Sequence, residues 1–244
     1  MFIRRTLAVL TIVVYAQAVE LPQYIKDLRC SPKKDFKNCF ITNGNKIIPQ
    51  IAKGLPELHV PKLNPLELPF LQLISTPTLN LNLSSLKIHG LEDMIIKDVR
   101  LLENFGGVSL KLGGKNMTVE GNYNIDGKVL ILPIRGNGHF SIYLKNGIYS
   151  PTVTTELQEK NGKKHYKSTG SKLNYSLEKI TFDLENLFDG NEQLGDEMNK
   201  FLNENWDVLA KDFGPGIANI VSALHRRIFD EFTSEIPISD LLLN

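Results

Sequence analysis

The middle of the chain alternates hydrophobic and polar residues with a period of two. Between Thr78 and Leu187 this alternation appears in residues 79–83, 108–112, 117–125, 128–134, 139–144 and 180–184. The same region contains the turn-forming pairs Gly106-Gly107, Gly113-Gly114, Asp126-Gly127, Asn146-Gly147 and Asn161-Gly162. Such alternation indicates strands with one buried face, and such pairs are typical of tight hairpins. The region is therefore predicted to fold as an antiparallel meander of long strands.

After this region the pattern changes to helical spacing. Hydrophobic residues then recur every three or four positions, at Leu194, Met198, Phe201, Leu202, Leu209, Phe213, Ile217, Ile220, Val221, Leu224, Ile228 and Phe232. A straight helix of this extent is about 58 Å long, and Gly214-Pro215-Gly216 is expected to kink it. Only the sheet offers an equally long surface to cover its hydrophobic face. We therefore predict an α+β fold in which a curved antiparallel sheet wraps a long C-terminal helix.

A shorter helix is predicted ahead of the sheet. Asp35 is a suitable N-cap for a helix that begins at Phe36, and hydrophobic residues follow at helical spacing. Gly44 and Pro49 interrupt this spacing, so we expect the helix to be bent or broken. Gly54 is expected to end it.

Residues 53–69, K-G-L-P-E-L-H-V-P-K-L-N-P-L-E-L-P, combine four prolines with closely spaced leucines. Proline at this density disfavours a helix and interrupts the hydrogen bonds of a sheet, yet the segment is too hydrophobic for a solvated linker. We predict an extended connection that lies against the body of the protein. Its leucines are expected to be mostly buried, while Glu57, Lys62 and Glu67 face water.

The start of the chain has the features of a secretory signal peptide. Two arginines precede a short hydrophobic run, and Ala16-Gln17-Ala18 provides a small-x-small exit. A membrane anchor is the alternative, but the run is shorter than a bilayer requires. We interpret residues 1–18 as a leader and residues 19–244 as a single exported domain without stable membrane insertion.

The charge balance argues against one class of partner. The chain has 28 Lys and Arg residues against 27 Asp and Glu residues, and the leader contains two of the basic ones. Nucleic-acid binding needs a basic face, which this balance does not favour. We therefore expect no nucleic-acid partner, and the sequence does not identify any cell-surface receptor.

Two cysteines, Cys30 and Cys39, are predicted to form one disulfide in an oxidising compartment. A metal site is the rival interpretation, but no histidine is closer than His59. Three sequons identify candidate glycan acceptors at expected surface positions, namely Asn82, Asn116 and Asn174.

No catalytic or cofactor-binding motif is recognisable. The sequence lacks the G-x-S-x-G nucleophile elbow, the phosphate loop G-x-x-x-x-G-K-[ST] and the H-E-x-x-H zinc helix. Gly136-Asn137-Gly138 lacks a third glycine and is interpreted as a turn between strands. The histidines are expected at the surface or at a rim: His59, His89, His139, His165 and His225. We therefore expect no enzyme, no cofactor and no metal.

Five segments, in order along the chain, resemble the takeout and juvenile-hormone-binding-protein family of insects. They are L-P-Q-Y-I-K-D-L-R-C (21–30) with its partner Cys39, A-K-G-L-P-E-L-H-V-P-K-L-N-P-L-E-L-P (52–69), G-L-E-D-M-I-I-K-D-V-R (90–100), residues 126–144, and F-L-N-E-N-W-D-V-L-A-K-D-F-G-P-G-I (201–217). The resemblance implies an elongated super-roll akin to a module of the tubular lipid-binding proteins, with an apolar tunnel. The implied ligand is juvenile hormone, another terpenoid or a fatty acyl lipid.

The resemblance also implies where and how such a protein acts. Takeout-like proteins are secreted into haemolymph or other extracellular fluid and have circadian, feeding or chemosensory roles. The hormone-binding proteins proper have a second disulfide, for which this chain has no cysteines. The chain is therefore more similar to takeout, and juvenile hormone is the less favoured ligand.

A tunnel for a hydrophobic ligand needs an unfilled apolar cavity and one or two polar groups. The candidate lining residues are Phe40, Ile47, Ile51, Leu55, Leu58, Leu68, Leu130, Leu132, Phe140, Ile142, Phe201, Leu209, Ile220 and Leu224. Tyr143 or Trp206 is the candidate polar group. For each apolar residue, an ordinary place in the core is the competing interpretation.

Two other functions compete with a carrier. A lipid-surface or pathogen-binding module of the bactericidal/permeability-increasing type would use a basic tip, for which Lys33, Lys34 and Lys37 are candidates. An esterase acting on hormone esters is the third hypothesis, and the missing nucleophile elbow argues against it.

Overall fold

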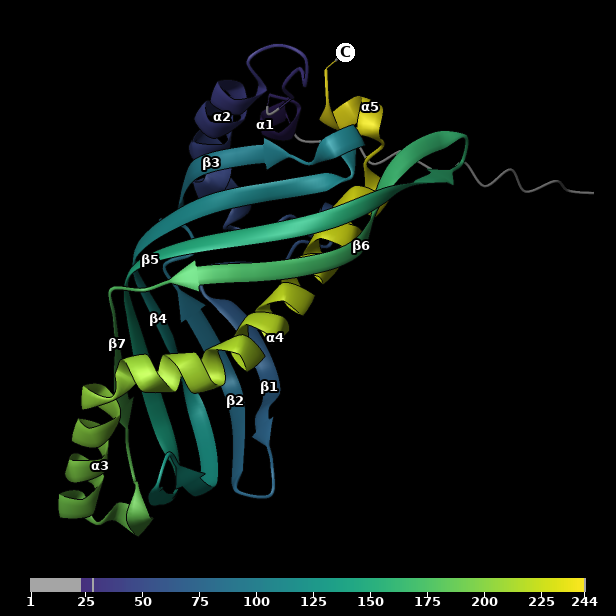
Figure 1. Ribbon diagram of the computed structural model, residues 1–244. Coiled ribbons are helices and arrows are strands. Elements are labelled where there is room, and N and C mark those ends of the chain that lie inside the picture. Colours follow the sequence, from purple (N-terminus) through teal and green to yellow (C-terminus); the bar gives the residue numbers. More distant parts are fainter. Residues whose placement is uncertain (1–22, 28, 244) are drawn as a thin grey trace, which may run out of the picture.

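The computed structural model describes residues 23–27 and 29–243 (Figure 1). The predicted leader, residues 1–18, lies outside the described residues. One antiparallel sheet makes up most of the molecule, and its strands are β1 (Leu66–Ser75), β2 (Leu79–His89), β3 (Ile95–Leu101), β4 (Gly107–Val129), β5 (Leu132–Lys160), β6 (Lys163–Ser176) and β7 (Lys179–Leu184). The predicted antiparallel meander is confirmed.

The sheet is organised around its two longest strands, β4 and β5. They pair from Gly107↔Thr154 to Val129↔Leu132, and each also pairs with two shorter strands on its other side. β4 pairs first with β3 and then with β2, while β5 pairs first with β7 and then with β6. Because the long strands bend across the molecule, one half of the sheet has β3 and β6 as edges and the other half has β1 and β7 (Figure 1).

Several predicted turns lie within strands instead. Gly113-Gly114 and Asp126-Gly127 belong to β4, and Gly136-Asn137-Gly138 and Asn146-Gly147 belong to β5. Gly127 is needed for another reason: its φ is +140°, and a Cβ there would collide with the backbone of Thr78.

The observed β4–β5 hairpin turn falls at Leu130 and Ile131. Leu130 has a φ of +53°, and Ile131 is 84% exposed. The interpretation of residues 128–134 as one continuous strand is therefore wrong. The pair Asn161-Gly162 does form the predicted turn, between β5 and β6.

The N-terminal helical region consists of α1 (Gln23–Lys26) and α2 (Phe36–Ile51). α2 continues through Gly44 and Pro49, so the expected break is absent. Asp35 precedes α2 but makes no capping bond, because its backbone is left-handed and its carboxylate accepts from the Asn38 amide at 2.7 Å. The predicted end at Gly54 is confirmed, since its φ is +86° and its N–H donates to Ile51 O at 2.8 Å.

The proline-rich segment is only partly extended. Pro56–Leu58 forms a 3₁₀ turn, η1, because proline is tolerated at the start of a helix. The segment then enters β1, and Pro69 is accommodated because β1 is an edge strand.

The predicted burial of the proline-rich segment is largely confirmed. Leu55, Leu58, Val60 and Leu66 are buried, while Leu63 and Leu68 are half-buried. Lys62 and Glu67 are exposed as expected. The side chain of Glu57 lies outside the described set.

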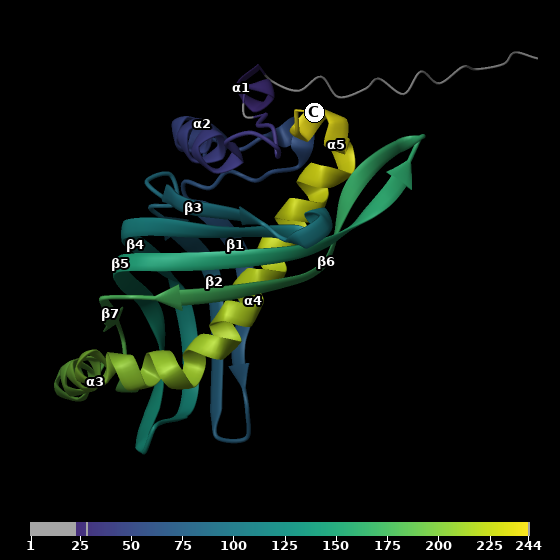
Figure 2. The same ribbon diagram turned by 45° about the horizontal axis from the view of Figure 1, so that its top comes forward.

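The C-terminal helical pattern forms two long helices rather than one. α3 (Glu192–Glu204) and α4 (Trp206–Glu235) meet at Asn205, and α5 (Ile238–Leu241) follows. α3 ends where the Asn205 amide and the Lys179 ammonium donate to the carbonyls of Phe201 and Asn203, at 2.8 and 2.9 Å. The break at Asn205 was not predicted. Helical structure continues through Gly214-Pro215-Gly216, and both views show α4 changing direction as it crosses the sheet (Figure 2).

Close approach of α4 to β6 requires a glycine. A Cβ at Gly214 would overlap the hydroxyl of Tyr175, which donates to Ala210 O at 3.3 Å. Short 3₁₀ turns complete the chain at η2 (Glu103–Phe105) and η3 (Phe188–Gly190).

The two ends of the described chain lie together. Cys30 and Cys39 form the predicted disulfide, with their Cα atoms 5.9 Å apart. Cys30 also pairs with Leu242 as a parallel β-bridge, and the Leu243 N–H donates to Cys30 O at 3.2 Å. Figure 1 accordingly shows α1 and α5 at the same end of the molecule.

Candidate ligand-binding site

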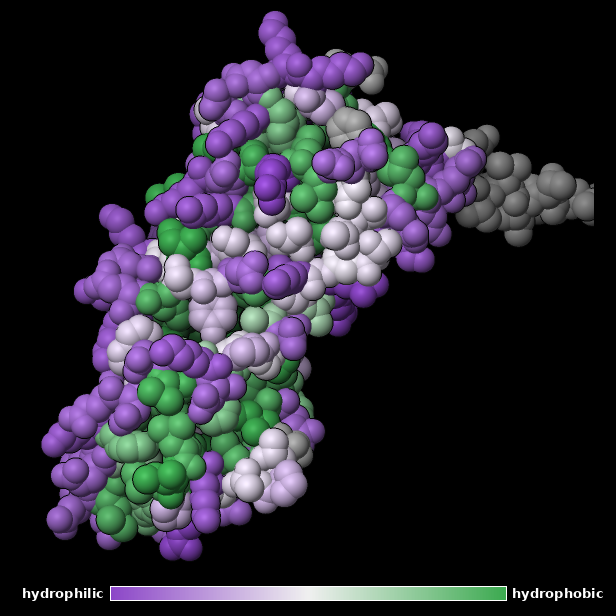
Figure 3. All heavy atoms as spheres, viewed as in Figure 1, coloured by the Kyte–Doolittle hydropathy of each residue, from purple (hydrophilic) through white to green (hydrophobic). Residues whose placement is uncertain are grey.

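The largest hydrophobic cluster lies between the sheet and the helices α3 and α4, and we call it the sheet cluster. Its buried members are Leu79, Leu83, Leu86, Tyr123, Ile125, Val129, Ile134, Phe140, Leu187, Met198, Leu202 and Leu209. Around them lie partly buried hydrophobic residues, namely Leu68, Leu71, Leu73, Ile74, Leu81, Val119, Leu130, Leu132, Ile142, Phe182, Leu184, Phe188, Phe201 and Phe213. In the view of Figure 3, hydrophobic residues gather at the surface of the end of the molecule that contains α3.

A second cluster, the terminal cluster, lies at the opposite end. It contains Ile25, Ile47, Leu55, Leu58, Val60 and Ile236, with Ile51, Ile228, Phe232 and Leu241 partly buried against them. These residues come from both ends of the chain and are mostly fully enclosed. The terminal cluster therefore has the character of an ordinary core.

α3 is fixed to the edge strand β7 by two asparagine side chains. The Asn203 amide accepts from the Phe182 N–H at 2.7 Å and donates to Phe182 O at 2.8 Å. Asn199, one turn earlier, makes the same pair of bonds with Leu184, at 3.0 and 2.9 Å. The two amides replace the neighbouring strand that an edge lacks, so Phe182 and Leu184 of β7 are satisfied on both sides.

α4 is fixed to the edge strand β6 by a charged pair. Asp230 accepts from the Ser168 N–H at 2.8 Å and from its hydroxyl at 2.6 Å. Arg226 donates to the Ser168 hydroxyl oxygen at 2.9 Å and to its carbonyl at 3.3 Å. Ser168 is 2% exposed, so these bonds compensate groups that water does not reach.

The other two edges are treated differently from each other. Asn45 of α2 accepts from the Ile96 N–H of β3 at 2.7 Å and donates to Ile96 O at 3.0 Å. In the part of the chain that the structure describes, no helix side chain makes such bonds with β1. β1 contains Pro69 instead, together with Phe70, which is 64% exposed. β1 is therefore the edge whose backbone is left without helix side chains among the described residues.

The structure divides the predicted lining residues between the two clusters. The sheet cluster contains seven of them: Leu68, Leu130, Leu132, Phe140, Ile142, Phe201 and Leu209. The terminal cluster contains Ile47, Ile51, Leu55 and Leu58. Phe40 is half-buried with its ring centroid 5.6 Å from that of Phe36, and Ile220 and Leu224 are half-buried on α4 outside both clusters. One continuous tunnel through all of them remains a prediction.

The two candidate polar groups do not lie inside the sheet cluster. Tyr143 is 47% exposed, whereas Phe140 on the same strand is 2% exposed. Its role as a tunnel group stays a prediction. Trp206 is half-buried at the start of α4, with the Lys179 ammonium 5.4 Å from its ring centroid, which is a cation–π contact at the edge of the helix.

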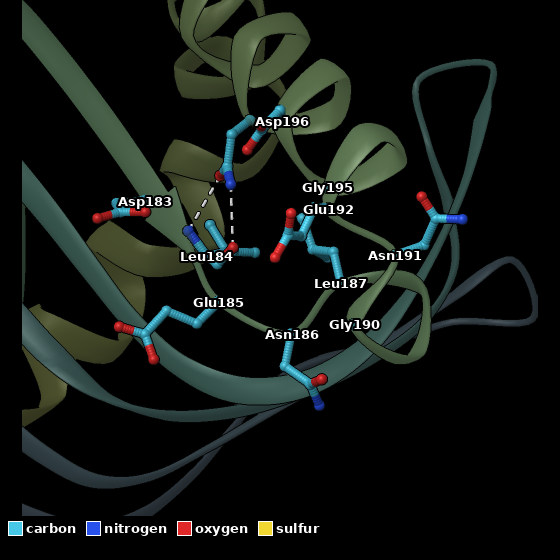
Figure 4. Close-up of a pocket in the computed structure, with 11 residues that line it drawn as sticks. Asp183, Leu184, Glu185, Asn186, Leu187, Gly190, Asn191, Glu192, Gly195 and Asp196 are labelled. Carbon is cyan, nitrogen blue, oxygen red and sulfur yellow. Dashed lines mark hydrogen bonds between the residues drawn. The ribbon is translucent and has the colours of Figure 1, made fainter.

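A pocket of about 300 Å³ lies where β7, η3 and α3 meet (Figure 4). Its lining is largely polar and acidic, and includes Asp183, Glu185, Asn186, Glu192 and Asp196. None of the predicted tunnel residues lines it. Acidic walls do not suit a hydrocarbon ligand, so we do not place the hydrophobic site there.

The expectation that every histidine lies at the surface or a rim is wrong for His165. This residue is 7% exposed, and its Nδ1 donates to Thr233 O at 3.0 Å. His225 is half-buried on α4, and burial lowers its pKa. His89 lies beside Glu120, with 3.2 Å between Nε2 and Oε1.

Several other predicted features can be placed on the structure. Asn116 and Asn174 are exposed and Asn82 is half-buried in β2, and whether they carry glycans remains a prediction. Of the three basic-tip lysines, Lys37 forms an ion pair with Asp98 at 2.8 Å. Within the described residues, no cluster of His, Cys, Asp and Glu has metal-binding geometry, and no helix is both long and apolar enough to cross a bilayer.

Sequence reasoning missed the residues that fasten the helices to the sheet edges. Asn199 and Asn203 are four residues apart on a predicted helix, so a polar pair on one face could have been read from the sequence. Ser168 and Asp230 are far apart in the chain, and no local pattern relates them. Their partnership required the structure.

This fold is that of a binding protein in which a long helix lies in a curved antiparallel sheet, with a partly exposed hydrophobic cluster between them. The family model described as haemolymph juvenile hormone binding protein matches residues 6–243. The chain therefore belongs to this family, and its members bind hydrophobic small molecules.

Individual relatives agree with this assignment. The circadian clock-controlled protein daywake of Drosophila yakuba is 27% identical over 225 residues, covering 87% of this chain and 85% of the relative. Daywake of Drosophila melanogaster matches with the same identity and coverage. The crystal structure of Takeout 1 from Epiphyas postvittana superposes with a TM-score of 0.78 at 25% identity, covering 89% of this chain and all of that one. The predicted takeout-like super-roll is thereby confirmed.

Proposed function

We propose that the protein is an extracellular carrier of a hydrophobic small molecule, a terpenoid or fatty acyl lipid, which it binds at the sheet cluster. The observation that supports this most directly is the belt of partly buried hydrophobic side chains between the sheet and α3 and α4. Family membership supports the ligand class. Burial of a hydrocarbon yields about 25 cal/mol per Å², so a few hundred Å² is sufficient for micromolar binding.

The same proposal covers the route of the protein. Residues 1–18 are proposed to direct export, and residues 19–244 to act as one monomeric domain. The Cys30–Cys39 disulfide supports an oxidising compartment. The names of the daywake relatives suggest a clock-linked role, which we include as part of the proposal.

The proposal can be tested with a fluorescent fatty acid, 11-(dansylamino)undecanoic acid. Binding at the sheet cluster should raise and blue-shift its emission, and farnesol or palmitic acid should displace it. Ile142→Gln should weaken probe binding about tenfold, because a polar amide replaces a hydrocarbon wall. The matched control is Thr181→Gln, since Thr181 lies on the adjacent strand and is exposed.

One outcome would refute the carrier function, and another would refute its placement at the sheet cluster. One is wild-type protein that binds none of these compounds and shows no copurifying lipid in native mass spectrometry. The other is equal weakening by Ile142→Gln and Thr181→Gln, which would exclude the sheet cluster as the site.

A further inference from the structure

The contact between α4 and β6 is a polar seam with hydrogen bonds at both ends. At one end the Thr233 hydroxyl donates to Tyr166 O at 3.0 Å, and Arg226 and Asp230 bind Ser168. At the other end Tyr175 donates to Ala210 O. Both views show α4 passing along β6 between these points (Figures 1 and 2).

The middle of the seam contains two polar atoms without partners. Ser171 Oγ and His225 Nδ1 are buried and make no hydrogen bond. Within the described residues only one other buried side-chain polar atom is unpaired, Oε2 of Glu92 in the loop before β3. Two of the three unpaired atoms are therefore on elements that pack against each other.

The register of the seam places both atoms between its two hydrogen-bonded ends. Ser171 is three residues beyond Ser168 on β6, and His225 precedes Arg226, the partner of Ser168, on α4. Ser171 also alternates in phase with Tyr175, whose hydroxyl reaches α4. On the helix, His225 continues the buried stripe of Ala218 and Ser222. Both side chains are thus directed into the seam.

Leaving such groups unpaired is costly for a folded protein. More than nine in ten buried polar groups in native structures have a partner, and each exception needs a cause such as a functional site or a bound molecule. Ser171 has a hydroxyl that both donates and accepts, and the neutral imidazole of His225 has one donor and one acceptor nitrogen. Burial lowers the pKa of His225, so the imidazole is neutral at pH 7.

We propose that the α4–β6 seam binds the oxygen-bearing end of a neutral amphiphile, an alcohol, ester or ketone, through the unpaired groups of Ser171 and His225. This inference rests on the proposed carrier function. The hydrocarbon part of the ligand would extend along α4 to Phe213 in the sheet cluster, about 18 Å away at the rise of a helix. A ligand with a neutral polar end is favoured because the charges of Arg226 and Asp230 already neutralise each other, so neither is left to pair with a charged ligand.

The inference is tested by pairing variants with two ligands that share a carbon skeleton, of which only one carries an oxygen. Displacement of the dansyl probe would be measured for farnesol and for farnesane, its saturated hydrocarbon counterpart. The variants are Ser171→Ala, His225→Leu and the double substitution, and the control is Lys172→Ala at the exposed neighbouring position on β6. Loss of the two neutral hydrogen bonds should weaken farnesol binding about tenfold in the double variant and leave farnesane unchanged.

A stability measurement separates this role from a structural one. If the atoms are unpaired in the free protein, removing them should leave the denaturant midpoint unchanged or raise it. A lowered midpoint would indicate hidden structural partners and would overturn the proposal.

The ligand results discriminate between the two proposals. Equal changes for farnesol and farnesane would overturn the proposed polar site in the seam while the carrier function stands. No change for either compound would do the same, and would mean that Ser171 and His225 bind only water. A wild-type protein that binds neither compound would overturn both.

Discussion

The edges β7 and β6 solve the same problem with different chemistry. β7 is covered by two neutral asparagine amides, which satisfy both the donor and the acceptor of each residue they contact. β6 is contacted by Arg226 and Asp230, which converge on Ser168, and by the Thr233 hydroxyl, which donates to Tyr166 O. The two β7 residues that α3 contacts are fully paired, whereas the β6 contact leaves Ser171 and His225 unpaired.

The difference indicates which helix is only structural. A helix that closes an edge gains most when every polar group that it contacts is paired, as at Phe182 and Leu184 beneath α3. α4 instead combines a strong anchor at Ser168 with an unsatisfied stretch, and natural proteins keep such inconsistencies mainly at functional sites. The comparison therefore points to the α4–β6 seam as the side of the roll that interacts with a ligand.

The largest effect is expected from breaking the charged anchor. Asp230→Ala removes the acceptor of two bonds from Ser168, whose N–H and hydroxyl are then buried without it. The free energy of unfolding should fall by about 3 kcal/mol, because bonds to a charged acceptor are worth about 1.5–3 kcal/mol each. Urea or guanidinium unfolding would measure this.

The control for this variant is Asp207→Ala on the same helix. Asp207 is exposed and its ion pair with Lys211 is 3.9 Å long, so its removal should change the unfolding free energy by less than about 1 kcal/mol. Equal losses for the two variants would show that Ser168 does not anchor α4.

A smaller effect is expected at the neutral edge. Asn203→Ala should lower the unfolding free energy by about 1–2 kcal/mol, because it removes two neutral bonds at Phe182 and water can reach the half-buried site. Glu204→Ala is the matched control at the exposed neighbouring position. Amide hydrogen exchange at Phe182 should accelerate in Asn203→Ala only, and unchanged exchange would contradict the strand-like role of the amide.

The smallest effect is expected at β3, where Lys37 supplements the Asn45 contact. The hydrogen bond from Lys37 lowers the pKa of Asp98 below its ordinary value of 3.8. A lowered pKa in the folded state gives stability that is complete above the ordinary pKa and disappears as the pH falls through the folded value. Lys37→Met should therefore be slightly less stable than wild type at pH 7, with the difference vanishing near about pH 2.

Denaturant midpoints at the two pH values would check this, with Lys34→Met as an exposed control. A difference between Lys37→Met and wild type that persists at low pH would mean that the lysine acts through packing rather than through its charge.

The sequence predicted which segments form helices and strands better than it predicted where each helix or strand begins and ends. Alternation and helical spacing predicted the sheet, α2 and the C-terminal helices, because burial of one face imposes a period on the residues. The turns in β4 and β5 could not be placed from glycine pairs, since Gly127 serves the close approach of Thr78 rather than a hairpin. Burial along residues 53–69 was predictable because a segment this rich in leucine is too hydrophobic to remain a solvated linker.

The candidate site was less accessible to prediction. Individual hydrophobic residues could be nominated, but their division into a sheet cluster and a terminal cluster depends on how the long strands bend. Exposure of Tyr143 follows from strand phase, which a shift of one residue reverses. The unpaired atoms of Ser171 and His225 have no sequence signature, because only the three-dimensional structure shows which buried polar atoms lack a hydrogen-bond partner.

The junction of Cys30 with Leu242 has a practical consequence for handling the molecule. Because both ends of the described chain meet there, a tag or surface tether at either end holds the protein by the same pole. The opposite pole, which contains α3, then points into solution. A single attachment would therefore present that side of the carrier uniformly to a ligand, a vesicle or a receptor passing over it.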